Sequence, residues 1–315
     1  MQSFPTRLKH TSLNAFRRSM QISNADLFVF VEGKSDRFFY NKVCLEALRG
    51  RGLTYQIRLA QELPGQTGGK AELLRCFSYL RQRNALLEDF KGRRFATVFF
   101  LDKDIEDLAR TTKNSIHLIY TQHYHLENYF FIHGDLIEAT AVASTLNHDD
   151  VRRSPIGNNL RWREQAADNW RDWVKLCVFT VLRRINYDSS FSVLSRINTG
   201  PYSAVNQNEY QRRLRELEAR SGLTSRGFAR AFRRISQHVD DLYNDREFDK
   251  VFKGQWYSYF LVEDSRRIAA GRPMDSASLP DKLILALQLT LNFQDPWAEH
   301  FRRPVEQIAE AITTR

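Results

Sequence analysis

The sequence has few cysteines, no long apolar run and no repeated or low-complexity segment. Its three cysteines, Cys44, Cys76 and Cys177, lie far apart without C-x-x-C spacing, which argues against a structural zinc site and against a disulfide framework. No stretch is long and apolar enough to cross a bilayer, and residues 1–23 are mixed and basic, unlike a secretory signal. We therefore expect a cytoplasmic protein that makes no membrane contact.

What is present is a globular composition with an excess of basic residues. Hydrophobic residues make up 42% of the sequence and charged residues 27%, which are globular values. Its 315 residues can hold one large domain or two of ordinary size. Lysine and arginine number 47 against 37 aspartates and glutamates, a net charge of +10. This surplus favours a polyanionic partner but does not identify it.

Two patterns follow one another along the chain. Short apolar runs first alternate with amphipathic segments, which predicts strands at 27–31, 54–60, 95–101 and 116–120 and helices at 36–48, 70–89 and 134–146. Helical periodicity then predicts helices near 160–184, 208–220, 225–244, 255–269, 279–291 and 303–313. The expected organisation is an N-terminal extension (1–24), an α/β domain with a parallel sheet (25–147) and a mainly α-helical region (148–315).

Carboxylates follow three of the predicted strands. Glu32 comes directly after the first strand, Asp102 and Asp104 follow the run 95–101, and Glu127 comes after the strand at 116–120. The carboxyl ends of parallel strands form one edge of a sheet, where ligands bind. Mg²⁺ takes hard oxygen ligands and bridges one or two carboxylates to substrate phosphate. The pattern thus predicts a divalent-metal site at this edge, with solvated acidic turns as the alternative.

Glu127 stands in an aromatic stretch, Tyr124 to Phe131. A carboxylate buried there without a partner would be costly, so it should face a metal, a basic side chain or backbone donors. His123, His125 and Glu127 alternate and raise a zinc alternative. No further histidine or cysteine spacing supports that alternative.

The segment Gly65 to Lys70 (GQTGGK) is similar to a phosphate-binding loop at first sight. It departs from the Walker A pattern, because Pro64 stands where the first glycine should be and Ala71 where Ser or Thr would hold magnesium. A flexible strand-to-helix connection is the favoured interpretation. A glycine-rich helix entry near substrate phosphate remains the alternative.

The predicted helix 225–244 carries a basic stripe and an apolar stripe on different faces. The basic stripe consists of Arg226, Arg230, Arg233 and Arg234. Such a stripe is either a solvated face or a nucleic-acid surface, and three arginines upstream, Arg212, Arg213 and Arg215, favour the second interpretation.

Several short motifs, taken together, resemble those of a known domain. Glu32-Gly33, Asp102-x-Asp104 and the α/β layout resemble the TOPRIM domain of topoisomerases, primases and OLD-type nucleases over about residues 25–145, and the run Glu32 to Asp36 (EGKSD) looks most like the OLD-like branch. Gly68-Gly69-Lys70, HLENY at 125–129 and FKGQW at 252–256 resemble a bacterial TOPRIM family with a helical C-terminal half. That family includes the TOPRIM effector of the PARIS phage-defence system. A topoisomerase is disfavoured because the chain has no room for the usual tyrosine-bearing domain, and a primase because it lacks a zinc-ribbon cysteine pattern.

The resemblance implies roles for particular residues. Glu32 would be the general acid/base or a metal-linked carboxylate. Asp102 and Asp104 would be the main ligands of the metal, which would be one or two ions of Mg²⁺ or Mn²⁺. The implied catalytic residues are Glu32, Asp36, Lys103 and Glu127; the implied metal ligands are Glu32, Asp102 and Asp104; the implied nucleic-acid contacts are Lys34, Lys70, Arg226, Arg230, Arg233 and Arg234.

The function implied by the resemblance is that of a Mg²⁺-dependent endonuclease, the toxic effector of a bacterial anti-phage system. Its substrate would be RNA, tRNA in particular, ahead of DNA. Its partner would be an ABC-type ATPase subunit of the same system, and the active form a homodimer. The alternative is a non-catalytic TOPRIM module that binds nucleic acid or an ATPase partner.

Overall fold

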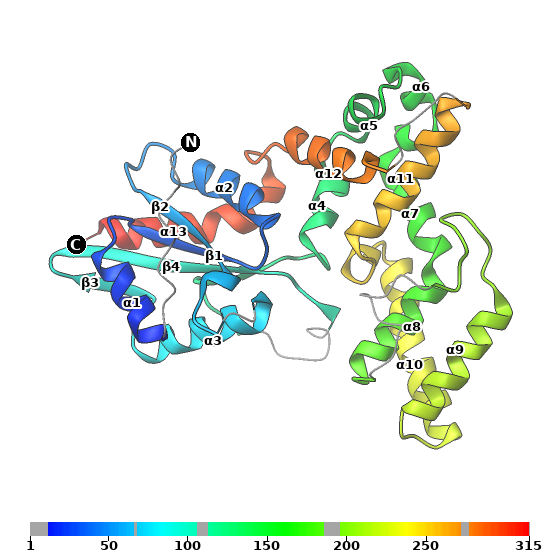
Figure 1. Cartoon of the computed structure of the whole chain (residues 1–315), viewed down its shortest axis with the longest axis horizontal. Coiled ribbons are helices and arrows are strands. Elements are labelled where there is room, and N and C mark those ends of the chain that lie inside the picture. Colours follow the sequence, from blue (N-terminus) through cyan, green and yellow to red (C-terminus); the bar gives the residue numbers. More distant parts are fainter. Residues whose placement is uncertain (1–11, 66–67, 106–112, 186–195, 272–276, 315) are drawn as a thin grey trace. The chain divides into compact units, whose positions relative to one another are not determined.

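The computed structural model describes residues 12–65, 68–105, 113–185, 196–271 and 277–314. The chain divides into two compact units. The first, called the sheet unit, is built from residues 1–102, 112–121 and 293–315, and the second, the helical unit, from residues 103–111 and 122–292. Figure 1 shows both with their helices and strands labelled.

The sheet unit is built on five strands. They are β1 (Leu27–Val31), β2 (Tyr55–Leu59), β3 (Leu87–Phe90), β4 (Arg93–Leu101) and β5 (Leu118–Tyr120). Their order is β2-β1-β4-β3, and β5 also pairs with β4. All pairs are parallel except β3 with β4. Every residue of β1 is buried, as expected for a central strand covered on both faces.

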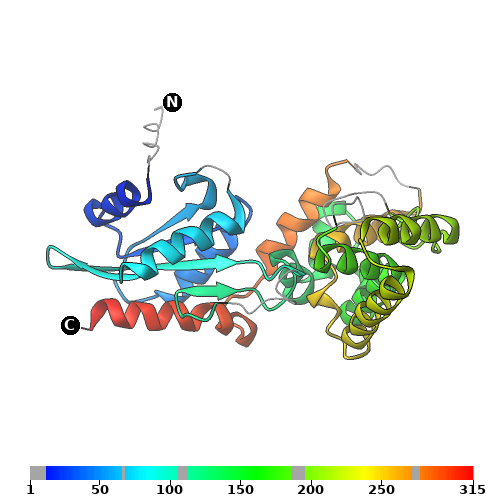
Figure 2. The ribbon, with the colours of Figure 1, turned by 90° about the horizontal axis from the view of Figure 1, so that it is seen from below.

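Helices cover both faces of this sheet. On one face, α1 (Leu13–Ile22) and α3 (Gly69–Gln82) share a core with Phe28, Phe30 and Phe99. On the other, α2 (Asp36–Ala47) and α13 (Glu299–Thr313) meet at Phe39 and Phe301, whose ring centroids are 5.4 Å apart. Figure 2 shows α13 on the side of the sheet opposite to α1. Short 3-10 turns at Ala60–Glu62 and Pro296–Ala298 complete the described part of the unit.

The helical unit contains nine described α-helices: α4 (Leu126–His133), α5 (Leu136–Ser144), α6 (His148–Arg153), α7 (Asn159–Asn169), α8 (Arg171–Leu182), α9 (Gln207–Arg220), α10 (Ser225–Asn244), α11 (Gly254–Ala269) and α12 (Leu279–Thr290). Two 3-10 turns lie at Pro155–Gly157 and Phe248–Lys250. The side chains of Trp162, Trp170 and Trp173 are buried in its core. Among the described residues, no helix has both the length and the apolar character that crossing a membrane requires.

The structure confirms a mixed α/β architecture with a parallel sheet and many helices. One predicted element is wrong over part of its length. The helix expected at 70–89 ends at Gln82, and residues 87–90 form strand β3. Lys91 and Gly92 both have positive φ, 51° and 80°, which suits a two-residue hairpin turn between β3 and β4. The helix expected at 160–184 is two helices, α7 and α8, which meet at Trp170.

The residue ranges of the two units differ from those of the predicted domains. Residues 122–147, expected in the α/β domain, belong to the helical unit, and the C-terminal helix α13 belongs to the sheet unit. Of the predicted N-terminal extension, residues 13–22 form α1, where Leu13, Phe16 and Met20 join the core beneath the sheet. Residues 1–11 lie outside the described part of the chain.

Candidate functional site

Two of the predicted site residues meet at the carboxyl edge of the sheet. β1 and β4 are parallel neighbours with Phe30 opposite Phe99, so the chain leaves both strands at the same edge. The carboxylate of Glu32, which follows β1, accepts a hydrogen bond from the backbone N–H of Asp102, which follows β4, at 2.9 Å. Both residues are partly exposed. The sheet thus brings the Glu32 carboxylate next to the backbone of Asp102, a residue 70 positions away in the sequence.

A lysine joins them from α3. Lys70, the second residue of that helix, donates from Nζ to the backbone carbonyl of Asp102 at 2.6 Å. Its ammonium group also lies 5.6 Å from the centroid of the Tyr120 ring. The ammonium group of Lys70, at the end of the glycine-rich segment, therefore lies at this edge. Gln66 and Thr67 of that segment lie outside the described residues.

Asp36 and Lys34 lie in the turn that follows Glu32. The carboxylate of Asp36 accepts from the backbone N–H of Gly33 at 2.8 Å and from the hydroxyl of Ser35 at 3.0 Å. These contacts fix the turn and the start of α2, which is a structural role for this carboxylate alongside the predicted catalytic one. Lys34 is exposed in the same turn.

The other predicted carboxylates lie in the helical unit. Glu127 is not at a strand end, as the sequence suggested, but in the first turn of α4, where the helix dipole favours negative charge. His125 lies beside it: its Nδ1 is 3.7 Å from the Glu127 carboxylate, and its Nε2 is 4.0 Å from that of Asp104. Lys103, also partly exposed, precedes Asp104. This unit therefore groups an imidazole with two carboxylates.

The donor set of the sheet unit suits a hard divalent cation. Glu32 and Asp102 offer carboxylate oxygens, and Mg²⁺ commonly binds to one or two carboxylates while it retains several waters. Within the described residues, no group of three or more His, Cys, Asp or Glu side chains is arranged to hold a metal ion. The zinc alternative at His123, His125 and Glu127 stays a prediction; the His123 ring packs against Tyr129, with centroids 4.8 Å apart.

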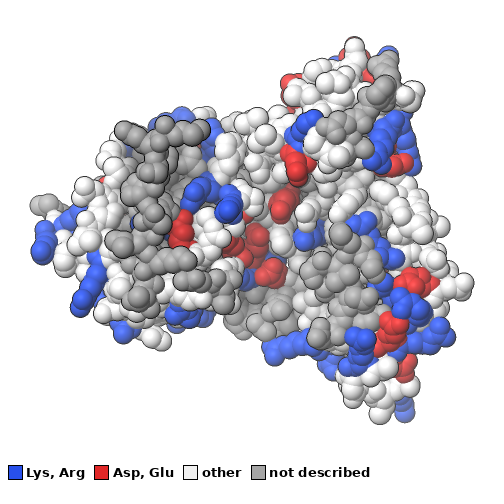
Figure 3. Space-filling model, viewed as in Figure 1, with Lys and Arg blue, Asp and Glu red and all other residues white. Residues whose placement is uncertain are grey.

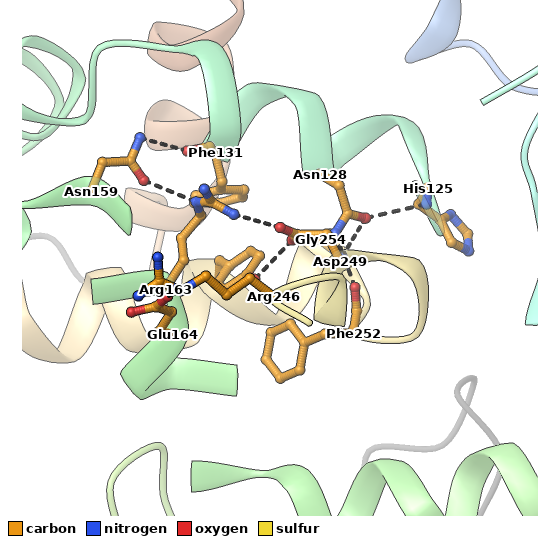
Figure 4. A network of polar contacts seen from close by, with 11 residues as sticks. His125, Asn128, Phe131, Asn159, Arg163, Glu164, Arg246, Asp249, Phe252 and Gly254 are labelled. Atoms are coloured by element: carbon orange, nitrogen blue, oxygen red, sulfur yellow. Dashed lines mark hydrogen bonds and ion pairs between the residues drawn. The ribbon is translucent and has the colours of Figure 1, made fainter. Parts of the chain in front are cut away.

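A buried amide fixes the segment that carries His125 and Glu127. Asn128 is fully buried, and its side chain makes four hydrogen bonds. Its oxygen accepts from the N–H groups of His125 and Gly254, and its NH₂ donates to the Asp249 carboxylate and to the carbonyl of Phe252. Figure 4 shows these contacts converging on Asn128. Since both amide atoms are saturated, the side chain holds α4 to the turn before α11 in one arrangement.

Asp249 is the second centre of this network. Its carboxylate accepts from Asn128 at 3.0 Å and from the hydroxyl of Tyr257 at 2.8 Å, and it forms a buried ion pair with Arg163. Burial, with the nearby Asp249 carboxylate as a further cause, raises the pKa of Tyr257 well above its ordinary value. The Tyr257 hydroxyl therefore remains a donor at all ordinary pH values.

The network joins two motifs that the sequence had singled out separately. Asn128 belongs to HLENY and Gly254 to FKGQW, and their contact is close: a Cβ on Gly254 would lie 2.3 Å from the backbone nitrogen of Asn128. Sequence reasoning missed Asn128, Arg163 and Asp249 as partners. The signal available was that both motifs resembled those of the same family, which suggested but did not specify a contact.

His133, at the end of α4, gives a prediction about pH. Burial first, then the positive charge of His123 and Arg163, lowers its pKa from 6.5 to about 4. Below pH 6.5 the unfolded chain therefore binds a proton that the folded chain does not, so the free energy of unfolding should fall as the pH drops from about 6.5 to about 4. His133→Gln should remove part of this fall. Urea unfolding of both proteins across that range measures it.

The matched control for His133 is His148→Gln, which alters an exposed histidine paired with Glu138 at 2.6 Å. Because this histidine is exposed, its substitution should not remove the fall in stability that the burial of His133 causes. Parallel stability curves for wild type and His133→Gln would contradict the argument.

The predicted nucleic-acid contacts Arg226, Arg230, Arg233 and Arg234 are all exposed on α10. Two of them, Arg230 and Arg234, line a groove of about 660 Å³ together with Arg183 and His238. The other two, Arg226 and Arg233, are not among its lining residues. The basic stripe thus divides into a groove-lining pair and a pair outside the groove.

No protein-family model and no curated protein matches this chain.

Proposed function

We propose that this protein is a Mg²⁺-dependent TOPRIM endonuclease that acts as the toxic effector of an anti-phage system. The observation that carries the proposal is the hydrogen bond between the Glu32 carboxylate and the Asp102 N–H at the shared edge of β1 and β4. The two motifs that resemble TOPRIM are E-G after one strand and D-x-D after another. They follow neighbouring parallel strands, which is what a metal site built from both motifs requires.

Glu32 and Asp102 would hold the ion. A bound Mg²⁺ would neutralise charge on the scissile phosphate and activate a water. The Asp102 N–H fixes one oxygen of Glu32, which sets the orientation of that carboxylate for accepting a proton. Lys70, held at the same edge by the Asp102 carbonyl, adds positive charge where a phosphate would develop negative charge.

The remaining parts of the proposal rest on the resemblance and the charge. The substrate is RNA, tRNA in particular, ahead of DNA. The partner is an ABC-type ATPase that holds the effector silent until it is triggered, and the active form is a homodimer. Of these, the net charge of +10 supports a polyanionic substrate directly.

A cleavage assay tests the proposal. Protein produced without the ATPase should cut tRNA when Mg²⁺ is added, because the carboxylates of Glu32 and Asp102 are the kind of ligand that Mg²⁺ prefers. Cleavage should stop when a chelator removes the metal. Labelled tRNA and a DNA hairpin, resolved on a denaturing gel, distinguish the substrates. Binding of either nucleic acid without metal-dependent cleavage, in protein that also causes no toxicity in cells, would favour the non-catalytic alternative.

A further inference from the structure

The described part of the helical unit carries a groove whose polar side chains are all basic or neutral. It lies between the C-terminal end of α8 and the side of α10, and its volume is about 660 Å³. Its floor is apolar, formed by Leu182, Ala231 and Ile235. Its polar lining consists of Arg183, Arg230, Arg234 and His238. No carboxylate is among these lining residues.

Several arginines of the helical unit pair with carboxylates, whereas within the described residues the arginines of the groove, like Arg226 and Arg233 outside it, do not. Figure 3 shows basic and acidic side chains mixed on the face it presents. Arg212 pairs with Glu209 and Glu216, and Arg171 pairs with Asp240. Within the described residues, by contrast, Arg183, Arg230 and Arg234 form no ion pair. All three are exposed, so their charge is available to a ligand.

The composition of the groove selects among anionic ligands. Guanidinium groups bind phosphate oxygens through two parallel hydrogen bonds, and Arg230 and Arg234 are one helical turn apart, so two groups face the groove in succession. No Phe, Tyr or Trp is among its lining residues, and Trp162, Trp170 and Trp173 are buried elsewhere in the unit. A ligand held by base stacking is therefore not what this groove fits.

We infer that this groove binds the phosphodiester backbone of the RNA substrate, with Arg183, Arg230, Arg234 and His238 as the contacts. The inference rests on the proposed function for its choice of RNA. It adds Arg183 and His238 to the contacts expected from sequence and removes Arg226 and Arg233 from them. Because phosphates carry no sequence information, the groove positions the RNA and does not read its bases.

The test compares two double variants that remove the same charge from the same helix. One is Arg230→Gln with Arg234→Gln, in the groove, and the control is Arg226→Gln with Arg233→Gln, outside it. Binding of a fluorescein-labelled tRNA is followed by anisotropy, in chelator, over a range of salt concentrations. The groove variant should bind several-fold more weakly, and the slope of log K against log salt should fall by about 1.4, or about 0.7 for each lost phosphate contact.

The control variant should keep the wild-type affinity and slope, and Arg183→Gln should weaken binding like a single groove substitution. Equal weakening by both double variants would overturn the inference, because it would show a diffuse electrostatic attraction. Unchanged binding in the groove variant would also overturn it. So would tighter binding of a DNA hairpin than of the matching RNA hairpin, or competition by polyglutamate as effective as that by RNA.

Because chelator is present throughout, the measurement does not depend on cleavage. A wild-type protein that binds tRNA through the groove but never cuts it would contradict the proposed nuclease and leave the groove assignment intact. If the groove double variant cut and bound tRNA as well as the wild type, the groove assignment would be contradicted and the proposed nuclease would stand. Thermal unfolding of each variant verifies that it is folded.

Discussion

Glu32→Gln should lower the rate of metal-dependent RNA cleavage by about 10²–10⁴-fold, the usual contribution of a general acid or base. The substitution is informative because the amide oxygen of glutamine can still accept the hydrogen bond from the Asp102 N–H. The loop between β1 and α2 should therefore keep its conformation, while the negative charge and the basic oxygen are lost. Single-turnover cleavage of labelled tRNA measures the effect, and Mg²⁺ titration by calorimetry measures the loss of the ligand separately.

Asp102→Asn gives a second, independent result. Two contacts of Asp102, one to Glu32 and one to Lys70, use its backbone N–H and carbonyl, which the substitution leaves in place. A loss of cleavage and of metal binding in this variant would therefore come from the carboxylate itself. Asp36→Asn separates the two roles of Asp36, because a residue that only fixes the turn through Gly33 and Ser35 should affect thermal stability more than cleavage.

The matched control is Glu62→Gln, which removes a carboxylate of the same unit that pairs with Arg37 and Arg58. It should cleave tRNA like the wild type. In cells that lack the ATPase partner, wild-type protein should be toxic and Glu32→Gln harmless. Wild-type rates in both Glu32→Gln and Asp102→Asn would rule out a nuclease centre at this edge.

The sequence predicted the strands better than the arrangement of the site. β1 was predicted to the residue because LFVFV is wholly apolar and has an abrupt polar exit at Glu32. β3 was missed because its sequence, LEDF, follows a helical run and carries two acids, and its place in the sheet comes from pairing with β4 across the Lys91-Gly92 turn. Local pattern thus identifies a buried central strand and fails for an edge strand, whose stability comes from its partner.

The acidic residues of the site also show that local sequence pattern does not predict contacts between distant parts of the chain. Parallel pairing of β1 with β4 could be anticipated, and with it the approach of Glu32 to Asp102. The position of Glu127 was not anticipated: α4 begins at Leu126, where the side chain of Asn128 binds the nearby His125 N–H and also residues more than 120 positions away. Contacts of such range leave no periodic signal in a single sequence.

Asp249→Ala should destabilise the helical unit by about 3–5 kcal/mol, the usual cost of removing one member of a buried ion pair. Both Asp249 and Arg163 are less than a tenth exposed. The substitution would take one acceptor from each of three buried groups, the guanidinium of Arg163, the amide of Asn128 and the hydroxyl of Tyr257. A buried N–H or O–H that loses its partner bears the full desolvation cost. Urea unfolding followed by tryptophan fluorescence measures the change.

Two further variants make the reason for the loss of stability testable. Arg163→Met should cost less, because Asp249 would still accept from Asn128 and Tyr257. Asp150→Ala breaks an exposed pair with Arg153 and should cost no more than about 1 kcal/mol. Equal losses for Asp249→Ala and Asp150→Ala would show that the network contributes nothing beyond surface pairing. A larger loss for Asp249→Ala would mean that Asp249 stabilises the helical unit through its buried contacts. Because one of these contacts is to Asn128, Asp249 would also fix the segment that carries His125 and Glu127. Asp249→Ala protein should then lose cleavage at temperatures where the unit is still folded.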